Sequence, residues 1–278
     1  PIYYIREKGI KVVRRNTGGG AVYHDLGNLN YSFIIPNVEM KVDFKTFTTP
    51  IVKALRSYGI DAEQTGRNDI LAGGRKFSGN AQQFSGHKLL HHGTLMFDVH
   101  MEDVADALNV KAGKFKSKAT KSVRSRVTNL KPLFFEQNGG KDMTVLEFKK
   151  LLLDWFGREY DLKTVELTED QKKEIELLQK EKFATDGWNF GRSPKADIVR
   201  GDFFRCGQVE FHFSVSEHRI QEVKITGDFF ASKDIEELEA MFAGVPYDRE
   251  GILAVLQNAE LGSYLGDVTA EELADVIV

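Results

Sequence analysis

The spacing of apolar residues early in the chain predicts strands mixed with a helix. Two runs rich in β-branched and aromatic residues, IKVVRR at 10–15 and NYSFII at 30–35, predict strands on either side of a glycine loop. Apolar residues then step by three and four from Phe44 to Tyr58. This spacing predicts a helix in which Pro50 marks a late start or a kink.

Turn residues and capping signals mark the other elements of this region. The segments 66–82 and 91–99 alternate apolar residues with glycine turns, which predicts short strands. Two capping boxes, in which a Thr precedes a Glu or Gln by three residues, predict helices that run to about residues 156 and 182. The capping pairs are Thr144 with Glu147 and Thr168 with Gln171.

A stretch of turn-forming residues without apolar periodicity, ATDGWNFGRSPKAD at 184–197, separates this region from the rest. We place a domain boundary there, near Gly187, which gives domains at 1–187 and 188–278. Beyond the boundary, strict alternation around a short polar turn at 217–218 predicts a β-hairpin. The alternating residues are Val209, Phe211, Phe213 and Val215, followed by Ile220, Val223 and Ile225.

Two helices complete the second region. The segment 232–242 predicts an amphipathic helix that ends at Gly244. Thr269 and Glu272 form a third capping box, which predicts a terminal helix. Together these elements predict a small α+β module. The apolar face of the first of these helices carries Ile235, Leu238, Met241 and Phe242.

The composition of the chain excludes several classes of partner and location. The net charge is -3, so no global basic field recruits nucleic acid or anionic lipid, and we expect neither partner. The single cysteine, Cys206, excludes an internal disulfide and fits a reducing, cytosolic compartment. No apolar run approaches the roughly 20 residues of a membrane span, and no signal peptide is visible. The chain begins at Pro1 without Met, which is consistent with a processed or incomplete form.

The segment RRNTGGGAVYHDLGN at 14–28 combines two arginines with three consecutive glycines. Backbone amides of a glycine turn can converge on an anion, and flanking arginines add charge-assisted hydrogen bonds. The spacing matches neither the glycine fingerprint of dinucleotide folds nor the P-loop lysine motif. A plain hairpin turn is the alternative interpretation.

A second cationic glycine segment follows at 66–82. Asn68, Asp69, Lys76 and Gly79 stand close together in it. Two such segments in one strand-rich domain predict a polyphosphate or an adenylate bound between loops. The alternative for Lys76 is a solvated surface lysine, which is the usual environment of this residue type.

Four motifs in this order carry a resemblance to a known family. RRNTGGGAVYHDLGNLNYSF, GRNDILAGGRKFSGNAQ, HHGTLMFDV and KSVRSRVTNL closely resemble the bacterial lipoate-protein ligases. WNFGRSP and GQVEFHFSV resemble that family's C-terminal accessory domain, so the likeness covers nearly the whole chain. The resemblance implies an α/β catalytic domain like those of biotin and lipoate-protein ligases, followed by a small α+β accessory domain.

The resemblance also implies a reaction in two steps. Lipoate and ATP give lipoyl-AMP and pyrophosphate, and a lysine of an acceptor domain then takes the acyl group. The acceptors would be lipoyl domains of 2-oxoacid dehydrogenases or the glycine-cleavage H protein. We expect Mg²⁺ to enter on the ATP phosphates and the enzyme to be a cytoplasmic monomer.

Site residues follow from the matching positions. The resemblance implies that Lys76 touches both ATP and lipoate and that 14–20 is the loop closing over the lipoyl group. The candidates for ATP or adenylate binding are Arg15, Gly20, Ala21, Val22, Tyr23, Asn68, Asp69, Lys76 and Arg124. The candidates for lipoate binding are Arg14, Gly18, Gly19, His24, Lys76, Gly79 and His92. An apolar slot for the acyl chain could be lined by Val22, Phe77 and Leu95, for which a core role is the alternative.

The chemistry of adenylation gives Lys76 an independent rationale. Forming an acyl-adenylate forces a carboxylate toward the α-phosphate, and a fixed ammonium lowers the repulsion between them. Lysine suits this task as a compact point charge. Asp69 is a candidate for orienting the incoming acceptor amine, and the alternative is a turn-capping aspartate.

Two other clusters have alternative interpretations. His91 and His92 near Asp98 and His100 could suggest a metal site, but we predict none, with one histidine packed and the other toward the cleft. The basic run at 107–135 is typical of a solvated or nucleic-acid-binding loop. The resemblance makes it the adenylate-binding loop. We therefore expect protease sensitivity between Lys111 and Lys121 that falls when the adenylate binds.

Cysteine usage separates two rival functions. Octanoyl and lipoyl transferases of this fold use a cysteine nucleophile in the catalytic domain, and the chain has no cysteine before Cys206. Cys206 is predicted to be a buried apolar residue. The second rival is a lipoate-binding or regulatory protein without catalysis, against which Lys76 and the complete glycine loop argue.

Overall fold

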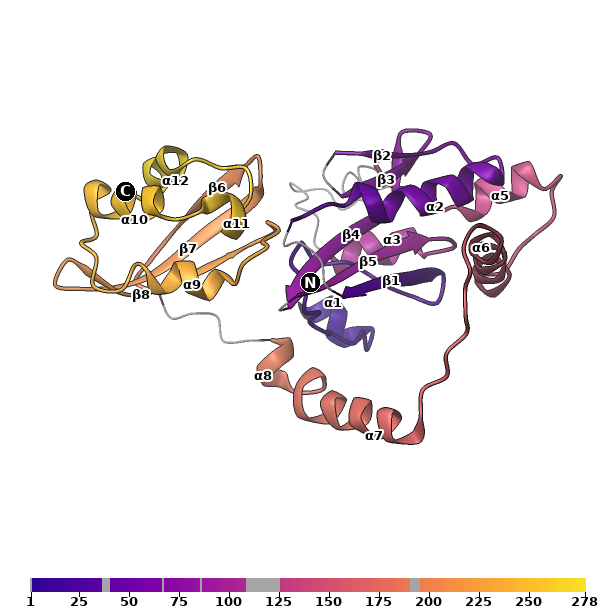
Figure 1. Cartoon of the computed structure of the whole chain (residues 1–278), viewed down its shortest axis with the longest axis horizontal. Coiled ribbons are helices and arrows are strands. Elements are labelled where there is room, and N and C mark those ends of the chain that lie inside the picture. The colour runs from indigo at the N-terminus through magenta and orange to yellow at the C-terminus, as the bar shows by residue number, and fades with distance from the viewer. Residues whose placement is uncertain (1, 37–40, 67, 86, 109–125, 191–195) are drawn as a thin grey trace.

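Two separate antiparallel sheets organise the chain (Figure 1). The computed structural model describes residues 2–36, 41–66, 68–85, 87–108, 126–190 and 196–278. The first sheet has the order β1-β5-β4-β3-β2, and the second has the order β6-β7-β8. The strands are β1 (Asn28–Pro36), β2 (Ala62–Thr65), β3 (Asp69–Ala72), β4 (Arg75–Ser85), β5 (Lys88–Met96), β6 (Ile198–Phe204), β7 (Gly207–Ser216) and β8 (Arg219–Gly227).

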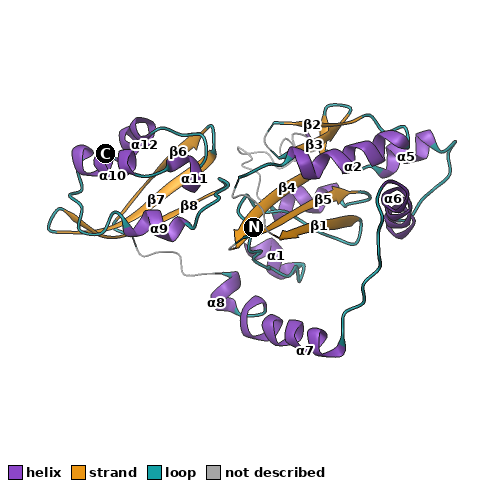
Figure 2. Ribbon diagram, viewed as in Figure 1, coloured by secondary structure: helices purple, strands orange, loops and turns teal. Residues whose placement is uncertain are grey.

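Helices lie against both sheets and along the connection between them (Figure 2). Those of the first region are α1 (Ile2–Glu7), α2 (Lys45–Ser57), α3 (Met101–Ala107), α5 (Lys131–Gln137) and α6 (Val145–Glu159). The connecting segment carries α7 (Glu169–Leu178), a π-helical turn η1 (Gln179–Phe183) and α8 (Asp186–Asn189). The second region has α9 (Ile235–Ala240), α10 (Arg249–Asn258), α11 (Leu261–Tyr264) and α12 (Ala270–Ile277). No helix in the described ranges has the length and apolar character that crossing a membrane requires.

The first core forms between one face of the five-stranded sheet and α2, α5 and α6. The predicted stripe on α2 is confirmed, and the helix runs through Pro50 after beginning at Lys45, so Pro50 does not delay its start. Phe77 and Leu95 of the sheet are fully buried in this core and do not line a ligand slot. Aromatic rings fill the space between the helices, as in the stacked pair Phe97 and Phe148, whose centroids are 4.6 Å apart.

The strand expected at 10–15 is not formed. Val13 in that run is 66% exposed, and the segment has no neighbouring strand among the described residues. The backbone of Arg14 bonds to α8 instead: its N–H donates to Asn189 Oδ1 at 2.9 Å and its carbonyl accepts from Trp188 Nε1 at 2.8 Å. These side-chain partners satisfy backbone groups that a sheet ladder would otherwise pair.

A tight hairpin positions the predicted second glycine segment. Gly73 and Gly74 both have positive φ, +55° and +73°, which is the conformation of a two-residue turn between β3 and β4. The hairpin places Asp69 opposite Gly79 in the ladder. The short strands predicted at 66–82 and 91–99 are therefore confirmed as β3, β4 and β5.

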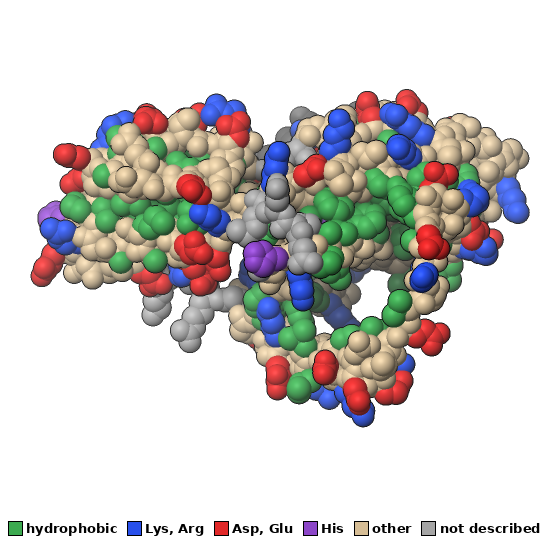
Figure 3. Space-filling model, in the orientation of Figure 1, with side chains coloured by type: hydrophobic (Ala, Val, Ile, Leu, Met, Phe, Trp, Pro, Cys, Tyr) green, Lys and Arg blue, Asp and Glu red, His purple; other side chains and the backbone are tan. Residues whose placement is uncertain are grey.

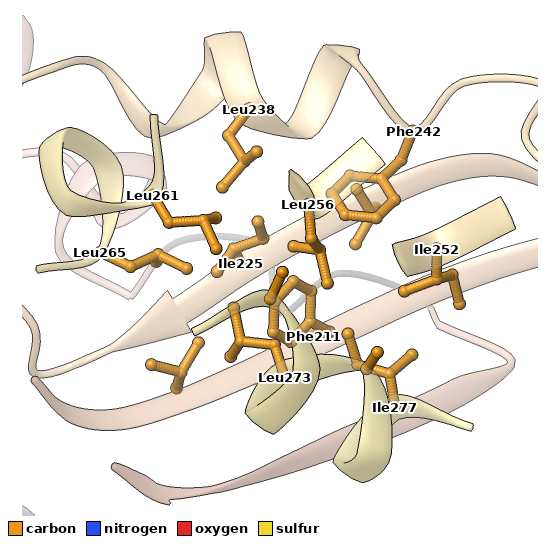
Figure 4. Close-up of a cluster of buried hydrophobic side chains, with 14 of the residues drawn as sticks. Phe211, Ile225, Leu238, Phe242, Ile252, Leu256, Leu261, Leu265, Leu273 and Ile277 are labelled. Atoms are coloured by element: carbon orange, nitrogen blue, oxygen red, sulfur yellow. The ribbon is translucent and has the colours of Figure 1, made fainter. Parts of the chain in front are cut away.

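The second core lies between the three-stranded sheet and α9, α10, α11 and α12. Figure 4 shows Phe211 and Ile225 of the sheet beside side chains from all four helices. The predicted hairpin is confirmed, with Glu217 and His218 at φ +50° and +59° in its turn. Cys206 is buried in this core, as predicted.

The helix predicted at 232–242 is shorter in the structure. Asp234 caps it by accepting from the N–H of Glu236, and α9 ends at Ala240. Met241 therefore falls in the following turn and is 43% exposed, so its expected place on the apolar face was wrong.

All three predicted capping boxes form. Each Thr side chain accepts from the N–H three residues later, and the Glu or Gln side chain bonds back to the Thr N–H. The helices they open differ in burial: α6 buries Phe148, Leu152 and Trp155, whereas all ten residues of α7 are described and none is buried. Figure 3 shows the α7 segment standing away from the rest of the molecule.

Candidate active site

The glycine loop at 14–20 is organised by one of its own arginines. Arg15 Nε donates to Thr17 Oγ1 at 3.0 Å, and Nη2 donates to the carbonyls of Gly18 at 2.6 Å and Gly20 at 2.9 Å. Burial lowers the pKa of the Arg15 guanidinium, which stays charged at neutral pH. The loop thus folds around the positively charged guanidinium of Arg15.

The loop is tied to the sheet through a residue that the sequence had not singled out. Thr17 is only 7% exposed, and its hydroxyl lies 2.6 Å from His92 Nε2 on β5. Burial, then the charge of Arg15 and that of His24, lower the pKa of His92. His92 is the histidine turned toward the loop, and its neighbour His91 is fully buried, which is the arrangement predicted for the pair.

His24 adds a third basic group to this cluster. Burial and then Arg15 lower its pKa, while Asp25 acts in the opposite direction. Asp25 itself is a structural clasp, because its carboxylate accepts from the N–H groups of Gly27 and His100, both at 2.8 Å. Arg15, His24 and His92 therefore make a positively biased site whose histidines are neutral at pH 7.

Lys76 lies on β4 and pairs with β3. Its Nζ is 2.8 Å from Asp69 Oδ1, and the two side chains are 40% and 34% exposed. Gly79 leaves room for the ammonium, because a Cβ there would lie 3.3 Å from Lys76 Nζ. Asp69 is therefore the ion-pair partner of Lys76.

The Lys76 ammonium and the Thr17–His92 contact lie on the same face of the sheet. Gly79 and Ala81 are two residues apart on β4, so they share a face, and Ala81 pairs with His92 of β5. Two strand residues span about 7 Å. The Lys76 ammonium over Gly79 and the Thr17–His92 contact are therefore separated by about the length of a short acyl chain.

Several other candidates are held by contacts within the protein or lie toward solvent. Asn68 Nδ2 donates to the Asn80 carbonyl at 2.6 Å, and Asn80 Nδ2 donates back to the Asn68 carbonyl at 2.9 Å. Arg14 Nε donates to the carbonyl of Trp188 on α8 at 2.9 Å. Of the four positions around residue 22 that are predicted to bind ATP, Gly20, Ala21 and Val22 lie toward solvent. The hydroxyl of the fourth, Tyr23, donates a hydrogen bond to Asp103 at 3.4 Å.

Two predictions concern residues that are not described. Arg124 and the segment between Lys111 and Lys121, for which we expect protease sensitivity, lie outside the described residues. Among the described ones, Asp98 pairs with Lys131 at 2.8 Å, and no group of three or more His, Cys, Asp or Glu side chains is placed to hold a metal ion.

A cavity opens beside the glycine loop on the side of the connecting segment. Its volume is about 340 Å³, and its lining is polar as well as apolar, which differs from the long apolar slot that the sequence suggested. The lining residues are Asn16, Ile34, Gln83, Ser85, Lys88, Leu89, Leu90 and Lys182. Of the residues proposed for the slot, Val22 is 51% exposed, and the other two belong to the core.

Two family models match the chain. The model of the lipoyl protein ligase A/B catalytic domain covers residues 1–157, and that of the bacterial lipoate protein ligase C-terminus covers residues 193–277. The chain belongs to the lipoate-protein ligase family. Both parts of the resemblance seen in the motifs are thereby confirmed.

Named relatives of this family are similar over almost the whole chain. Lipoate-protein ligase LplJ of Bacillus subtilis is 42% identical over 278 residues, which are 99% of this chain and 82% of the relative. Lipoate–protein ligase 1 of Staphylococcus aureus is 41% identical over 97% of this chain and 81% of its own length.

Solved structures of this ligase family share the fold. LipL1 of P. falciparum in complex with lipoate has a TM-score of 0.76 at 24% identity, with 99% of this chain and 79% of that chain covered. A bipartite lipoate protein ligase of Thermoplasma acidophilum, solved with its E2 lipoyl domain, has a TM-score of 0.61 at 29% identity over 71% and 77%. Lipoate-protein ligase A bound with ATP has a TM-score of 0.57 at 28% identity over 69% and 76%.

Proposed function

We propose that this ligase activates lipoate with ATP to lipoyl-AMP and then transfers the lipoyl group to a lysine of an acceptor domain. The observation that carries the proposal is the placement of the Lys76 ammonium on the same sheet face as the glycine loop held by His92. A cation at one end and a small-residue loop at the other suit a ligand with a carboxylate head and an acyl chain.

In the first step, Lys76 lowers the repulsion between two anions. The lipoate carboxylate attacks the α-phosphate of ATP, an O–P bond forms, and the bond to pyrophosphate breaks. Asp69 holds the ammonium over Gly79 at 2.8 Å, so its position is set before the substrates arrive. Preorganised charge of this kind acts without reorganisation during the reaction.

In the second step, the acceptor amine attacks the acyl carbon, and AMP leaves. Lys76 again stabilises negative charge, now on the departing phosphate. Lys76 contacts Oδ1 of Asp69, and the carboxylate has a second oxygen that can accept from the incoming amine and orient it while Lys76 stays in place. The attacking amine has to lose a proton, which a carboxylate beside it can receive.

The acceptors and the metal follow from this chemistry. The acceptor lysine belongs to lipoyl domains of 2-oxoacid dehydrogenases or to the glycine-cleavage H protein. Mg²⁺ binds together with ATP, because the phosphate oxygens are hard donors of the kind that this ion prefers. The proposal requires no other ligands for it. The enzyme works as a cytoplasmic monomer, and the boundary between its catalytic and accessory domains lies near Gly187.

A cysteine-dependent acyl transfer fits this chain poorly. Cys206, its single cysteine, is 4% exposed and lies in the core of the second region. A nucleophile has to reach the acyl group, and a buried thiol in a separate core cannot do so.

The direct test is the release of pyrophosphate when the protein is mixed with ATP and lipoate. Release that requires both compounds, followed by a mass increase of one lipoyl group on an added lipoyl domain, is the expected result. A variant of that domain with its acceptor lysine changed to Arg serves as control. Pyrophosphate release that does not depend on lipoate, or no release at all, contradicts the proposal.

A further inference from the structure

A residue of the second region is buried against the catalytic sheet. Phe230, between β8 and α9, is only 6% exposed. It forms a small apolar cluster with Phe44 and Ala81, and its ring meets that of Phe44 at 4.9 Å and 65°. Since both partners belong to the first region, the burial of Phe230 depends on contact between the two regions.

The backbone that presents Phe230 is fixed at both ends. The N–H of Gln208 donates to Asp228 Oδ1 at 2.6 Å, and the N–H of Ser232 donates to the Ser263 carbonyl at 2.8 Å. Phe229 packs partly against the second core. Phe229 thus packs against the core of the second region, whereas Phe230 projects from this fixed backbone toward the first region.

The glycine loop is shaped to this contact. A Cβ on Gly18 would lie 2.8 Å from the Phe229 carbonyl oxygen, so any larger residue would push the two regions apart. Gly19 has φ +93°, and a Cβ on it would lie 3.6 Å from the Phe230 ring. Gly20, by contrast, faces open space, since nothing lies within 4 Å of its Cβ position.

The contact of Phe230 with Ala81 lies on the strip of sheet surface between the Lys76 ammonium and His92. Phe230 packs on Ala81, which pairs with His92 and lies two residues from Gly79 beneath Lys76. The ring lies at the glycine-loop end of the strip, because a Cβ on Gly19 would be 3.6 Å from it. An acyl chain whose carboxylate lies at Lys76 and whose tail points to the glycine loop therefore ends against this ring.

From this placement we propose that Phe230 is a wall of the acyl site supplied by the accessory domain, and that it limits the length of the chain that is activated. The inference rests on the proposed function. Removing a ring that bounds an apolar pocket adds room for further methylenes, which such pockets discriminate by about ten-fold or more each.

The experiment measures kcat/KM for pyrophosphate release with straight-chain acids from hexanoate to dodecanoate. Phe230→Ala is expected to shift the preference toward longer acids, by about 10²-fold for decanoate relative to octanoate, which is two methylenes shorter. Phe230→Trp is expected to shift it toward shorter acids. Gly18→Ala should resemble Phe230→Ala, because its Cβ displaces Phe229 and with it the wall.

The matched control is Phe203→Ala, since Phe203 is a phenylalanine of the same region that is 71% exposed. It should leave the length profile unchanged. If Phe230→Ala lowers the rate for all acids in parallel, or leaves every ratio unchanged, Phe230 is not a wall of the site. Failure of the wild-type protein to activate any acid would instead overturn the proposed function.

Discussion

At the scale of single residues, the three glycines of the loop serve different purposes. Gly18 admits the Phe229 carbonyl, Gly19 adopts a positive φ, and Gly20 has open space around its Cβ position. The two glycine segments with their cations pointed to an anion site, and Lys76, Asp69 and Gly79 do lie together. Sequence could not show that Arg15 holds the carbonyls of its own loop, because that depends on the path of the folded backbone.

Thr17 is the residue at this scale that sequence reasoning missed. A threonine beside glycines is usually a turn residue, and only the fold brings its hydroxyl to His92. A signal was present, since Thr17 stands between a cationic and a flexible stretch, but spacing alone cannot pair residues 75 positions apart.

Thr17→Val removes the hydroxyl that joins Arg15 to His92 while keeping the shape of the side chain. We expect weaker lipoate binding, by about ten-fold, because a lost buried hydrogen bond is worth about 1 kcal/mol or somewhat more. Isothermal titration calorimetry of the purified variant measures this change. Thr17→Ser retains the hydroxyl and should bind as the wild type does; equal affinity for all three proteins contradicts the role of the hydroxyl.

His91 makes stability depend on pH. Burial, followed by the neighbouring His92, lowers the pKa of His91 from 6.5 to about 4. The unfolded chain therefore takes up a proton near pH 6.5, whereas the folded chain does so only near pH 4. The free energy of unfolding should fall across this interval as pH is lowered, by up to about 3 kcal/mol.

Urea unfolding at pH 7 and pH 4.5, followed by tryptophan fluorescence, measures this loss. His91→Phe keeps a ring beside Phe47, whose centroid lies 4.8 Å from that of His91, and has no proton to gain. Its stability should vary less with pH over the same interval. An equal slope in wild type and variant would assign the effect to other groups.

At the scale of elements, most strands and helices were predictable because period and capping chemistry are local. The three capping boxes, the α2 stripe and the β7–β8 hairpin are of this kind. The prediction of a strand at 10–15 was wrong because a strand also needs a neighbouring strand to bond with. The backbone of Arg14 is hydrogen-bonded to side chains of α8 instead. Six helices in the described part of the chain were not foreseen: α1, α3, α5, α8, α10 and α11. Five of them have seven residues or fewer, and so few residues carry little periodicity.

Two capping boxes with the same chemistry should differ in their effect on stability. Thr144→Ala removes the cap of α6, which buries three core residues, and should lower the free energy of unfolding by about 1 kcal/mol. Thr168→Ala removes the cap of α7, in which no residue is buried, and should affect only local fraying.

Urea unfolding of both variants tests the first difference, and amide hydrogen exchange along α7 tests the second. We expect Thr168→Ala to speed exchange in α7 while the midpoint of global unfolding stays close to that of the wild type. Equal loss of global stability in the two variants would show that α7 is coupled to a core.

At the scale of the whole molecule, sequence indicated two regions, and each has a core of its own. The contact between them was not predictable, because Phe229 and Phe230 look alike in sequence yet join different cores. The two regions therefore meet at the glycine loop, which is also the loop that we propose closes over the lipoyl group.

The central claim is that one ammonium, that of Lys76, brings the carboxylate and the α-phosphate together. The most direct measurement is single-turnover formation of lipoyl-AMP by Lys76→Ala, with Lys53→Ala, an exposed lysine on α2, as control. We predict a rate lower by about 10²–10³-fold for Lys76→Ala, the usual effect of removing one preorganised electrostatic group, and no such loss for Lys53→Ala. Formation of the adenylate by Lys76→Ala at the wild-type rate would contradict it.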